Sequence, residues 1–202
     1  MGSSLAYDDR LDHLLNVAAR VFAEQGYHST AMRDLARETG MSLAGMYHYV
    51  RGKDELLYLI QHRCFGNVLA GAERMLERHA NDRAEERLTA FIRHHVIFFA
   101  RHMAEMKVLS HEAECLSGDH LEGINALKRE YVGRLVGLIR DLDGTDDIDP
   151  NVAAYALFGM MNWIYNWYDP TGPVAPGELA RQFTAIFLTG LRAPVSTLIE
   201  RG

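Results

Sequence analysis

Apolar residues recur every three or four positions along almost the whole chain, which is the spacing of a helix with one buried face. The segment from Asp9 to Gln25 shows it most clearly, because most of its apolar side chains fall on one stripe. They are Leu11, Leu14, Leu15, Ala18, Val21 and Phe22. Gly26 follows directly and predicts the end of this helix.

The later segments repeat this pattern between short polar or glycine-containing breaks. Further helices are predicted over residues 30–40, 42–50, 53–79, 84–101, 104–116, 121–141, 151–168 and 176–192. Alternating runs rich in β-branched residues are missing, and the sequence contains neither an internal repeat nor a low-complexity segment. The pattern therefore predicts an all-α chain of about nine helices.

The stretch TGMSLAGMYHYVRGKDELL, residues 39–57, predicts a helix-turn-helix. Gly40 permits a left-handed backbone between the two helices, and Met41 is expected to fill the angle between them. Ser42 is expected to cap the second of the two helices through its hydroxyl.

The outward face of that second helix is unusual for a surface that serves stability alone. Its members are Leu43, Ala44, Gly45, Tyr47, His48 and Tyr49. The small residues allow the helix axis to approach another surface closely, and the tyrosines carry a hydroxyl on a rigid arm. These side chains suit DNA, where phosphate contacts fix the register and contacts to base edges read the sequence. The alternative is a packing motif without DNA affinity, in which Tyr47 is buried.

Two further phosphate contacts are expected beside this face. Lys53 stands at the head of the long fourth helix, whose first amides are free to bind an anion. Ser29 and Thr30 are expected to cap the second helix, and Arg33 lies close to its first amides.

The charge balance argues against a polycationic nucleic-acid binder. The chain carries 21 Lys and Arg against 27 Asp and Glu, a formal net charge of −6. Residues 1–60 hold six basic and eight acidic residues, or −2 formally. DNA binding therefore has to rest on local placement of charge and on helix dipoles, which supply positive potential without formal charge.

From Arg10 to Leu57 the chain resembles the DNA-binding head of the tetracycline-repressor (TetR) family. The matching positions are Phe22, Gly26, Tyr27, Thr30, Leu35, Ala36, Gly40, Met41, Ser42, Gly45, Tyr47, Tyr49 and Lys53. Val50 departs from the family's usual Phe, and Ala31 from its common second Ser or Thr. The resemblance implies that Thr30, Arg33, Ser42, Gly45, Tyr47, His48, Tyr49 and Lys53 lie at or near DNA.

The same resemblance implies a DNA-binding domain over residues 8–53 and a helical body over residues 54–195 that binds a ligand and dimerises. The apolar residues of 151–170 surround most of the predicted helix, so it has to be covered on all sides. We expect this helix and the one over 176–192 to pair with their symmetry mates as a four-helix bundle. The interface residues are expected to be Tyr155, Gly159, Trp163, Trp167, Phe183, Ile186, Phe187 and Gly190. The alternative is that both are ordinary core helices of a monomer.

Adaptable methionines and aromatic rings in the body are candidates for an apolar effector site, although such stripes equally suit an ordinary core. The candidates are Phe99, Met103, Met106, Leu109, Phe158, Met161, Asn162, Tyr165 and Asn166. Asn162 and Asn166 are candidates for hydrogen bonds to a thioester or hydroxyl, or else to backbone or a partner subunit.

The C-terminal part also resembles one subgroup of the family, many of whose members respond to fatty acyl or steroid-derived acyl-CoA thioesters and control lipid breakdown. The residues that carry this resemblance are Trp167, Tyr168, Pro170, Gly172 and Pro173. An acyl-CoA is therefore the expected effector.

Other classes find little support in the sequence. No apolar run is long enough to span a membrane, no secretory signal is visible, and Cys64 and Cys115 form no CxxC pair, so a cytoplasmic location with reduced thiols is expected. Nucleophile, phosphate-loop and dinucleotide signatures are missing, so neither enzyme activity nor a cofactor is expected. His111 and Glu114 have a spacing compatible with a metal, but no HExxH or CxxC motif accompanies them, and no metal site is expected.

The sequence thus predicts a homodimeric transcriptional repressor that binds a palindromic operator and is released by a small apolar effector. Two alternatives stay open: an all-α interaction module, and a regulator that responds to a metal or another small molecule.

Overall fold

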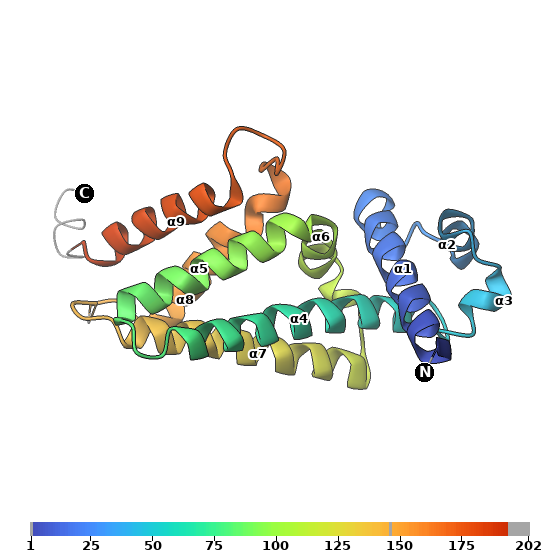
Figure 1. The fold of residues 1–202 in the computed structure, drawn as a ribbon, viewed down its shortest axis with the longest axis horizontal. Helices are drawn as coiled ribbons and strands as arrows, with labels where there is room; N and C mark the ends of the chain where they lie inside the picture. Colours follow the sequence, from blue (N-terminus) through green and yellow to red (C-terminus); the bar gives the residue numbers. More distant parts are fainter. Residues whose placement is uncertain (1, 146, 194–202) are drawn as a thin grey trace. The chain divides into compact units, whose positions relative to one another are not determined.

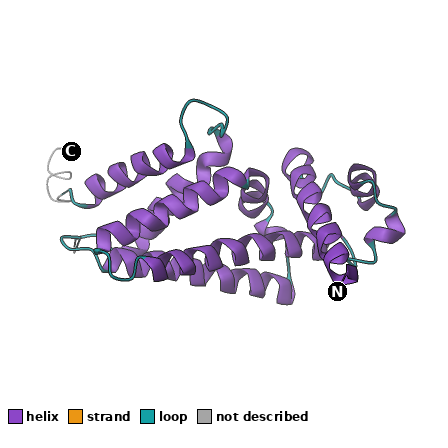
Figure 2. Ribbon diagram, viewed as in Figure 1, coloured by secondary structure: helices purple, strands orange, loops and turns teal. Residues whose placement is uncertain are grey.

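The computed structural model describes residues 2–145 and 147–193. Within them the chain forms nine α-helices and two short 3-10 helices, and no strand (Figure 2). The all-α prediction is therefore confirmed. Contacts group the helices into two compact units. The first unit comprises the described residues up to Gly66 with His102–Leu127, and the second comprises Asn67–Arg101 with the described residues from Lys128 onward.

The first unit contains the predicted helix-turn-helix. Its elements are α1 (Gly2–Gln25), α2 (Met32–Thr39), α3 (Leu43–Met46), the first part of α4 (Lys53–Arg78), α6 (Met103–His111), the 3-10 helix η1 (Ala113–Cys115) and the first part of α7 (Gly118–Arg140) (Figure 1). The predicted stripe of α1 forms much of the core, with Leu14, Ala18 and Val21 completely buried. Gly26 ends α1 at a φ of 84°, a conformation that favours glycine.

The turn between α2 and α3 has the predicted chemistry. Gly40 adopts the left-handed conformation at a φ of 68°, and the Ser42 Oγ accepts a hydrogen bond of 3.0 Å from the Gly45 amide. Met41 is half-buried against the core of the first unit. The regular part of α3 is only four residues long, and Tyr47 to Tyr49 continue as a turn rather than as the predicted helix to residue 50.

The predicted caps of α2 are wrong. The cap position is Ala31, whose amide donates to the Asp34 carboxylate at 3.0 Å. Thr30 instead turns its hydroxyl back to the Gly26 carbonyl at 2.9 Å, because the chain is still leaving α1 at this point.

The second unit contains the rest of α4 and α7 together with α5 (Ala84–Arg101), α8 (Pro150–Asn162), the 3-10 helix η2 (Trp163–Asn166) and α9 (Pro176–Leu191). Asp149 caps α8, because its Oδ1 accepts from the amides of Asn151 at 2.7 Å and Val152 at 3.2 Å. The predicted helix over 151–168 is therefore two elements, α8 and η2.

The two compact units do not coincide with the predicted domains. Helix α4 begins at Lys53, at the expected boundary, and its first part belongs to the first unit up to Gly66. Residues 102–127 also group with the helix-turn-helix. The division between residues 53 and 54 is implied by the family resemblance, and it remains a prediction. Its C-terminal end, residues 194–195, lies outside the described residues.

Candidate nucleic-acid interface

Helix α3 has one side packed in the core of the first unit and one side exposed to solvent. Met46 is completely buried, which anchors the helix, whereas Ala44, Tyr47 and His48 are exposed. Half of the Tyr47 surface is accessible. The alternative in which Tyr47 is buried is therefore wrong, and the rigid phenol projects where a ligand can reach it.

Tyr49 is half-buried because it contacts Tyr7 of α1, with ring centroids 4.7 Å apart. Tyr7 itself is 40% exposed, so the two rings form a small aromatic platform that solvent can reach. Tyr49 follows Tyr47 by two residues, which puts this platform close to the end of α3. Leu43 and Gly45 are also half-buried, and Ser42 is exposed. The predicted face is thus a mixture of open and supporting residues.

Lys53 is held by the protein itself. Its ammonium donates to the carbonyl oxygens of Tyr27 at 2.8 Å and Thr30 at 3.1 Å, and it lies 4.3 Å from the Tyr27 ring centroid. The Tyr27 hydroxyl also donates to the Asp54 carboxylate. These contacts tie the start of α4 to the turn between α1 and α2. A lysine has three donor protons, so one remains for the predicted phosphate contact.

The other two predicted phosphate residues differ from each other. Thr30 is 1% exposed and its hydroxyl is already bonded, so it supports the turn and presents no hydroxyl to DNA. Arg33 is exposed, and within the described residues its guanidinium has no carboxylate partner. Arg33 is therefore available for an anion.

In the second unit, α8, η2 and α9 present an apolar stripe to solvent. Tyr155 is 65% exposed, Trp163 58%, Trp167 55% and Ile186 62%. Exposed aromatic residues in such number are characteristic of an interaction surface. Gly159 and Gly190 lie exposed on α8 and α9, and a Cβ atom added at either would meet nothing within 4 Å.

Two residues predicted for the same interface lie elsewhere. Phe183 and Phe187 are each only 8% exposed and point into the second unit's own core. Their assignment to the dimer face needs correction: they adjoin Ile186 and Gly190 on α9 but are covered by the second unit's own core.

The interior of the second unit contains a buried histidine in an aromatic surround. His95 is 1% exposed and contacts the rings of Phe99, Tyr131 and Phe158. Its Nε2 lies 3.1 Å from Asn162 Oδ1, and its Nδ1 lies 3.1 Å from the Tyr131 hydroxyl. Burial lowers the pKa of His95 to about 3, so the ring is neutral near pH 7. The neutral ring donates from Nε2 to Asn162 and accepts at Nδ1 from Tyr131.

This burial predicts a specific loss of stability in acid. The unfolded chain binds a proton at His95 below about pH 6.5, whereas the folded chain does not until about pH 3. Between pH 7.5 and pH 5 the wild type should lose about 2 kcal/mol of unfolding free energy through this residue alone. Urea unfolding at the two pH values measures the loss. His95→Gln should lack this part of the pH dependence, whereas His62→Gln, at an exposed position on α4, should retain it. An equal loss in wild type and His95→Gln would contradict the assignment.

The remaining effector candidates are distributed over both units. Met161 and Phe158 are buried in the second unit, where Tyr165 is half-buried and Asn166 exposed. In the first unit Met106 and Leu109 are buried, and Met103 is half-buried. Their role in binding an effector stays a prediction.

A groove of about 730 Å³ lies on the second unit, along the end of α4 and one face of α5. Arg93, Ile97 and Arg101 recur at every fourth position of α5 and line it with Arg78 and Phe98. Within the described residues neither Arg93 nor Arg101 has an ion-pair partner. This groove therefore combines apolar surface with available guanidinium groups.

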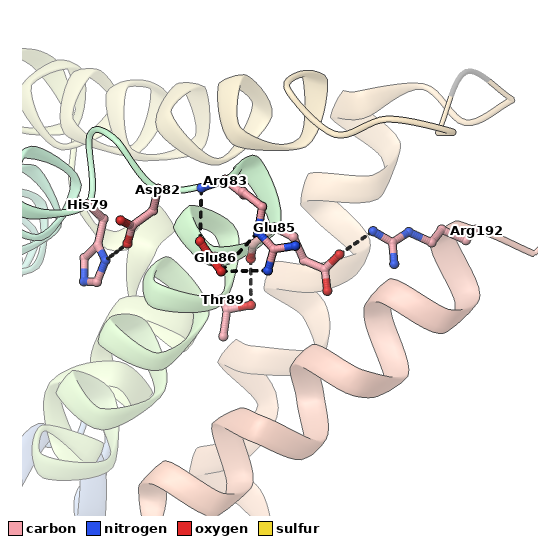
Figure 3. A network of polar contacts seen from close by, with 7 residues as sticks. All are labelled: His79, Asp82, Arg83, Glu85, Glu86, Thr89 and Arg192. Carbon is pink, nitrogen blue, oxygen red and sulfur yellow. Dashed lines mark hydrogen bonds and ion pairs between the residues drawn. The ribbon is translucent and has the colours of Figure 1, made fainter.

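The acidic residues at one end of this groove are already paired (Figure 3). Asp82 accepts from His79 at 2.6 Å, Glu86 from Arg83 at 2.7 Å, and Glu85 from Arg192 at 2.5 Å. The hydrogen bond from Arg83 lowers the pKa of Glu86. Because these carboxylates already have hydrogen-bond partners of their own, they leave the arginines of α5 available to an anionic ligand.

Comparison with known families agrees with the helix-turn-helix geometry. Residues 14–58 match the family described as bacterial regulatory proteins of the tetR family, and residues 81–191, more than half of the chain, match the tetracyclin repressor-like C-terminal domain. The chain belongs to the TetR family. It is thus a DNA-binding transcriptional regulator, and the predicted family, fold class and regulatory function are confirmed.

Similar proteins support this TetR assignment along most of the chain. The transcriptional repressor KstR2 of Mycolicibacterium smegmatis is 28% identical over 188 residues, 90% of each chain. The structure of the TetR-family regulator PfmR from Thermus thermophilus has a TM-score of 0.78 at 28% identity, covering 87% of this chain and 97% of that one. The structure of AibR in complex with isovaleryl coenzyme A and operator DNA has a TM-score of 0.74 at 29% identity, covering 88% and 97%.

Sequence reasoning did not identify two features of this TetR chain. Tyr7 belongs to the aromatic platform, and its position four residues before Leu11 and seven before Leu14 places it on the stripe of α1. The arginines of the groove also recur at helical spacing, but nothing local distinguishes them from a solvated face.

None of the described helices is both long and apolar enough to cross a membrane.

Proposed function

We propose that this TetR-family regulator is a homodimeric repressor whose two α3 surfaces contact a palindromic operator. The observation that carries this proposal is the half-exposed Tyr47 beside a helix whose other side is fixed by Met46 and whose start is capped by Ser42. Each element has a separate physical role: the cap and the buried side hold the helix, and the open side meets DNA. The protein would act in the cytoplasm, where operator DNA is found, and without catalysis.

The acidic net charge of −6 does not oppose this function. Arg33 and Lys53 are the cations proposed to meet phosphates. Two acidic residues near them are engaged: Asp34 with the Ala31 amide, and Glu55 with Arg51. Phosphates therefore meet donors locally, although the whole chain is anionic. Because the contacts are electrostatic, operator binding should weaken as salt concentration rises.

A second copy of the chain is the proposed cover for the exposed stripe on α8, η2 and α9. Four large apolar residues with more than half of their surface exposed are costly to leave in water. The two open glycines would allow the helices of two copies to approach closely. A dimer also explains how such a short reading helix discriminates between sites, since two copies sum their contacts over two half-sites.

An acyl-CoA is the proposed effector. The subgroup resemblance points to this class, and the related regulator AibR forms a complex with isovaleryl coenzyme A. The groove on α5 supplies what such a ligand requires, because Arg93 and Arg101 suit phosphates while Ile97 and Phe98 suit methylene groups. Phe98 contacts Phe99 with ring centroids 5.1 Å apart, so the wall of the groove adjoins the aromatic interior around His95.

Release of operator DNA tests the effector proposal. A duplex selected by the protein from random sequences is labelled, and its fluorescence anisotropy is followed with acyl-CoAs of increasing chain length, free coenzyme A and free fatty acids. Only acyl-CoAs should release the duplex. Arg93→Gln should raise the required concentration about 10-fold through loss of one charge-assisted contact.

The matched control for that variant is Arg129→Gln, at an exposed arginine of α7 outside the groove, which should respond as the wild type does. Both variants should bind the duplex with unchanged affinity in the absence of effector. Release by fatty acids alone, or an unaltered response of Arg93→Gln, would contradict the proposed ligand or its site.

A further inference from the structure

A second cluster of ligand-forming side chains lies in the first unit, and its members belong neither to the proposed DNA face nor to the groove of the second unit. His28 comes from the turn between α1 and α2, whereas Glu112 and Cys115 come from the junction of α6 and η1. The Cys115 Sγ lies 3.2 Å from His28 Nε2 and 3.3 Å from Glu112 Oε2. All three ligand atoms lie within 4.8 Å of one another. The fold thus brings together residues 87 positions apart in the sequence.

The carboxylate of this cluster is held in place. The Tyr27 amide donates to Glu112 Oε1 at 3.1 Å, so the Oε2 atom remains directed at the cysteine. The Gln61 side chain donates to the Glu112 carbonyl at 3.3 Å, which fixes the backbone at the end of α6. Tyr27 is itself fixed by Lys53 and Asp54. Supporting hydrogen bonds of this kind orient the ligands in protein metal sites.

The spacing is close to that of tetrahedral coordination. An ion bound to sulfur at about 2.3 Å and to nitrogen or oxygen at about 2.0–2.2 Å holds the sulfur roughly 3.5–3.7 Å from each of the other ligand atoms. The separations from the Cys115 sulfur are 3.2 Å to His28 and 3.3 Å to Glu112, so the side chains would move apart by a few tenths of an ångström on binding. His28 is exposed, so its imidazole can adjust to complete the third separation.

We propose that His28, Glu112 and Cys115 form a binding site for a borderline-soft divalent cation of the zinc type. Thiolate and imidazole ligands favour Zn²⁺ over Mg²⁺ or Ca²⁺, and three protein ligands leave the fourth position for water or an exogenous ligand. A thiolate and a carboxylate neutralise the ion's charge.

The bound ion would connect two parts of the first unit that the chain joins only through long segments. His28 is followed by the residues that lead into α2, and Cys115 ends the segment that begins with α6. Metal binding would therefore stiffen the unit that carries the recognition helix. The site makes the regulator a candidate for control by a metal in addition to an organic effector, and it does not depend on the identity of that effector.

Cobalt binding tests the site in the full-length protein after treatment with a chelator. Co²⁺ should bind with one ion per chain and produce a thiolate-to-cobalt charge-transfer band, which added Zn²⁺ should abolish. Cys115→Ser should lose the band, and His28→Gln should bind at least ~10-fold more weakly. Zn²⁺ should raise the thermal midpoint of the wild type and leave that of Cys115→Ser unchanged.

Two matched controls make the assignment specific. Cys64→Ala removes the other, buried cysteine, and His111→Gln removes the exposed histidine next to Glu112, so both should bind Co²⁺ as the wild type does. Absence of a thiolate band from the folded wild type, or its loss in Cys64→Ala but not in Cys115→Ser, would overturn the proposal. Equal binding by wild type and His28→Gln would do so as well. These measurements contain no DNA, so their failure leaves the repressor proposal unaffected.

Discussion

Replacing Tyr47 with alanine should weaken operator binding by at least ~30-fold, because a contact of about 1–3 kcal/mol is lost once in each half-site. The fold should be preserved, since half of this side chain is exposed and the neighbouring Met46 still anchors α3. Fluorescence anisotropy with the selected duplex measures the affinity, and circular dichroism with thermal unfolding measures the integrity of the fold.

Tyr47→Phe separates the hydroxyl from the ring in this experiment. If the hydroxyl bonds a phosphate or a base edge, the phenylalanine variant should bind nearly as weakly as the alanine variant. If ring packing dominates, it should bind nearly as well as the wild type. A Tyr47→Ala protein that is folded and binds the duplex with wild-type affinity would contradict the proposed reading surface.

Replacing Gly159 with glutamine should separate the dimer into folded monomers. The added side chain has open space within its own chain, and glutamine favours a helix over glycine, so the monomer should not be destabilised. In the proposed dimer the same side chain is forced into a close helix contact. Overpacking costs about 1–3 kcal/mol and occurs on both subunits, so the dimer should weaken at least ~30-fold. Sedimentation velocity over a range of protein concentrations measures the change.

Gly133→Gln is the matched control, because Gly133 is an exposed glycine of α7 with no atom within 4 Å of an added Cβ. This variant should remain dimeric and bind the operator normally. Gly159→Gln should lose operator affinity together with dimerisation. If Gly159→Gln remains dimeric at the protein concentrations at which the wild type is dimeric, the interface lies elsewhere.

The sequence anticipated the features that depend on neighbouring residues. A glycine followed by an apolar residue and a serine determines the turn at Gly40 to Ser42 through local backbone and capping preferences, and the structure has this turn as predicted. Thr30 shows the limit of such reasoning. Its residue type suits a cap, but its hydroxyl follows the direction of the chain leaving α1 and bonds Gly26 instead.

Features that depend on distant parts of the chain could not be predicted. Helix α9 is apolar on several sides, so its sequence alone does not show which side is buried. In the structure Phe187 faces the chain's own core and Ile186 faces solvent. The cluster of His28, Glu112 and Cys115 has no local motif, because its members meet only when α6 and η1 reach the turn after α1. The groove likewise depends on how α4 and α5 lie together.

Selection of duplexes from a random-sequence library by the purified wild-type protein tests the central claim most directly. Two identical α3 surfaces held in one dimer should enrich an inverted repeat, with half-sites about one helical turn of 10–10.5 base pairs apart or more. Enrichment of a single unrepeated motif, or of no sequence at all, would contradict the account.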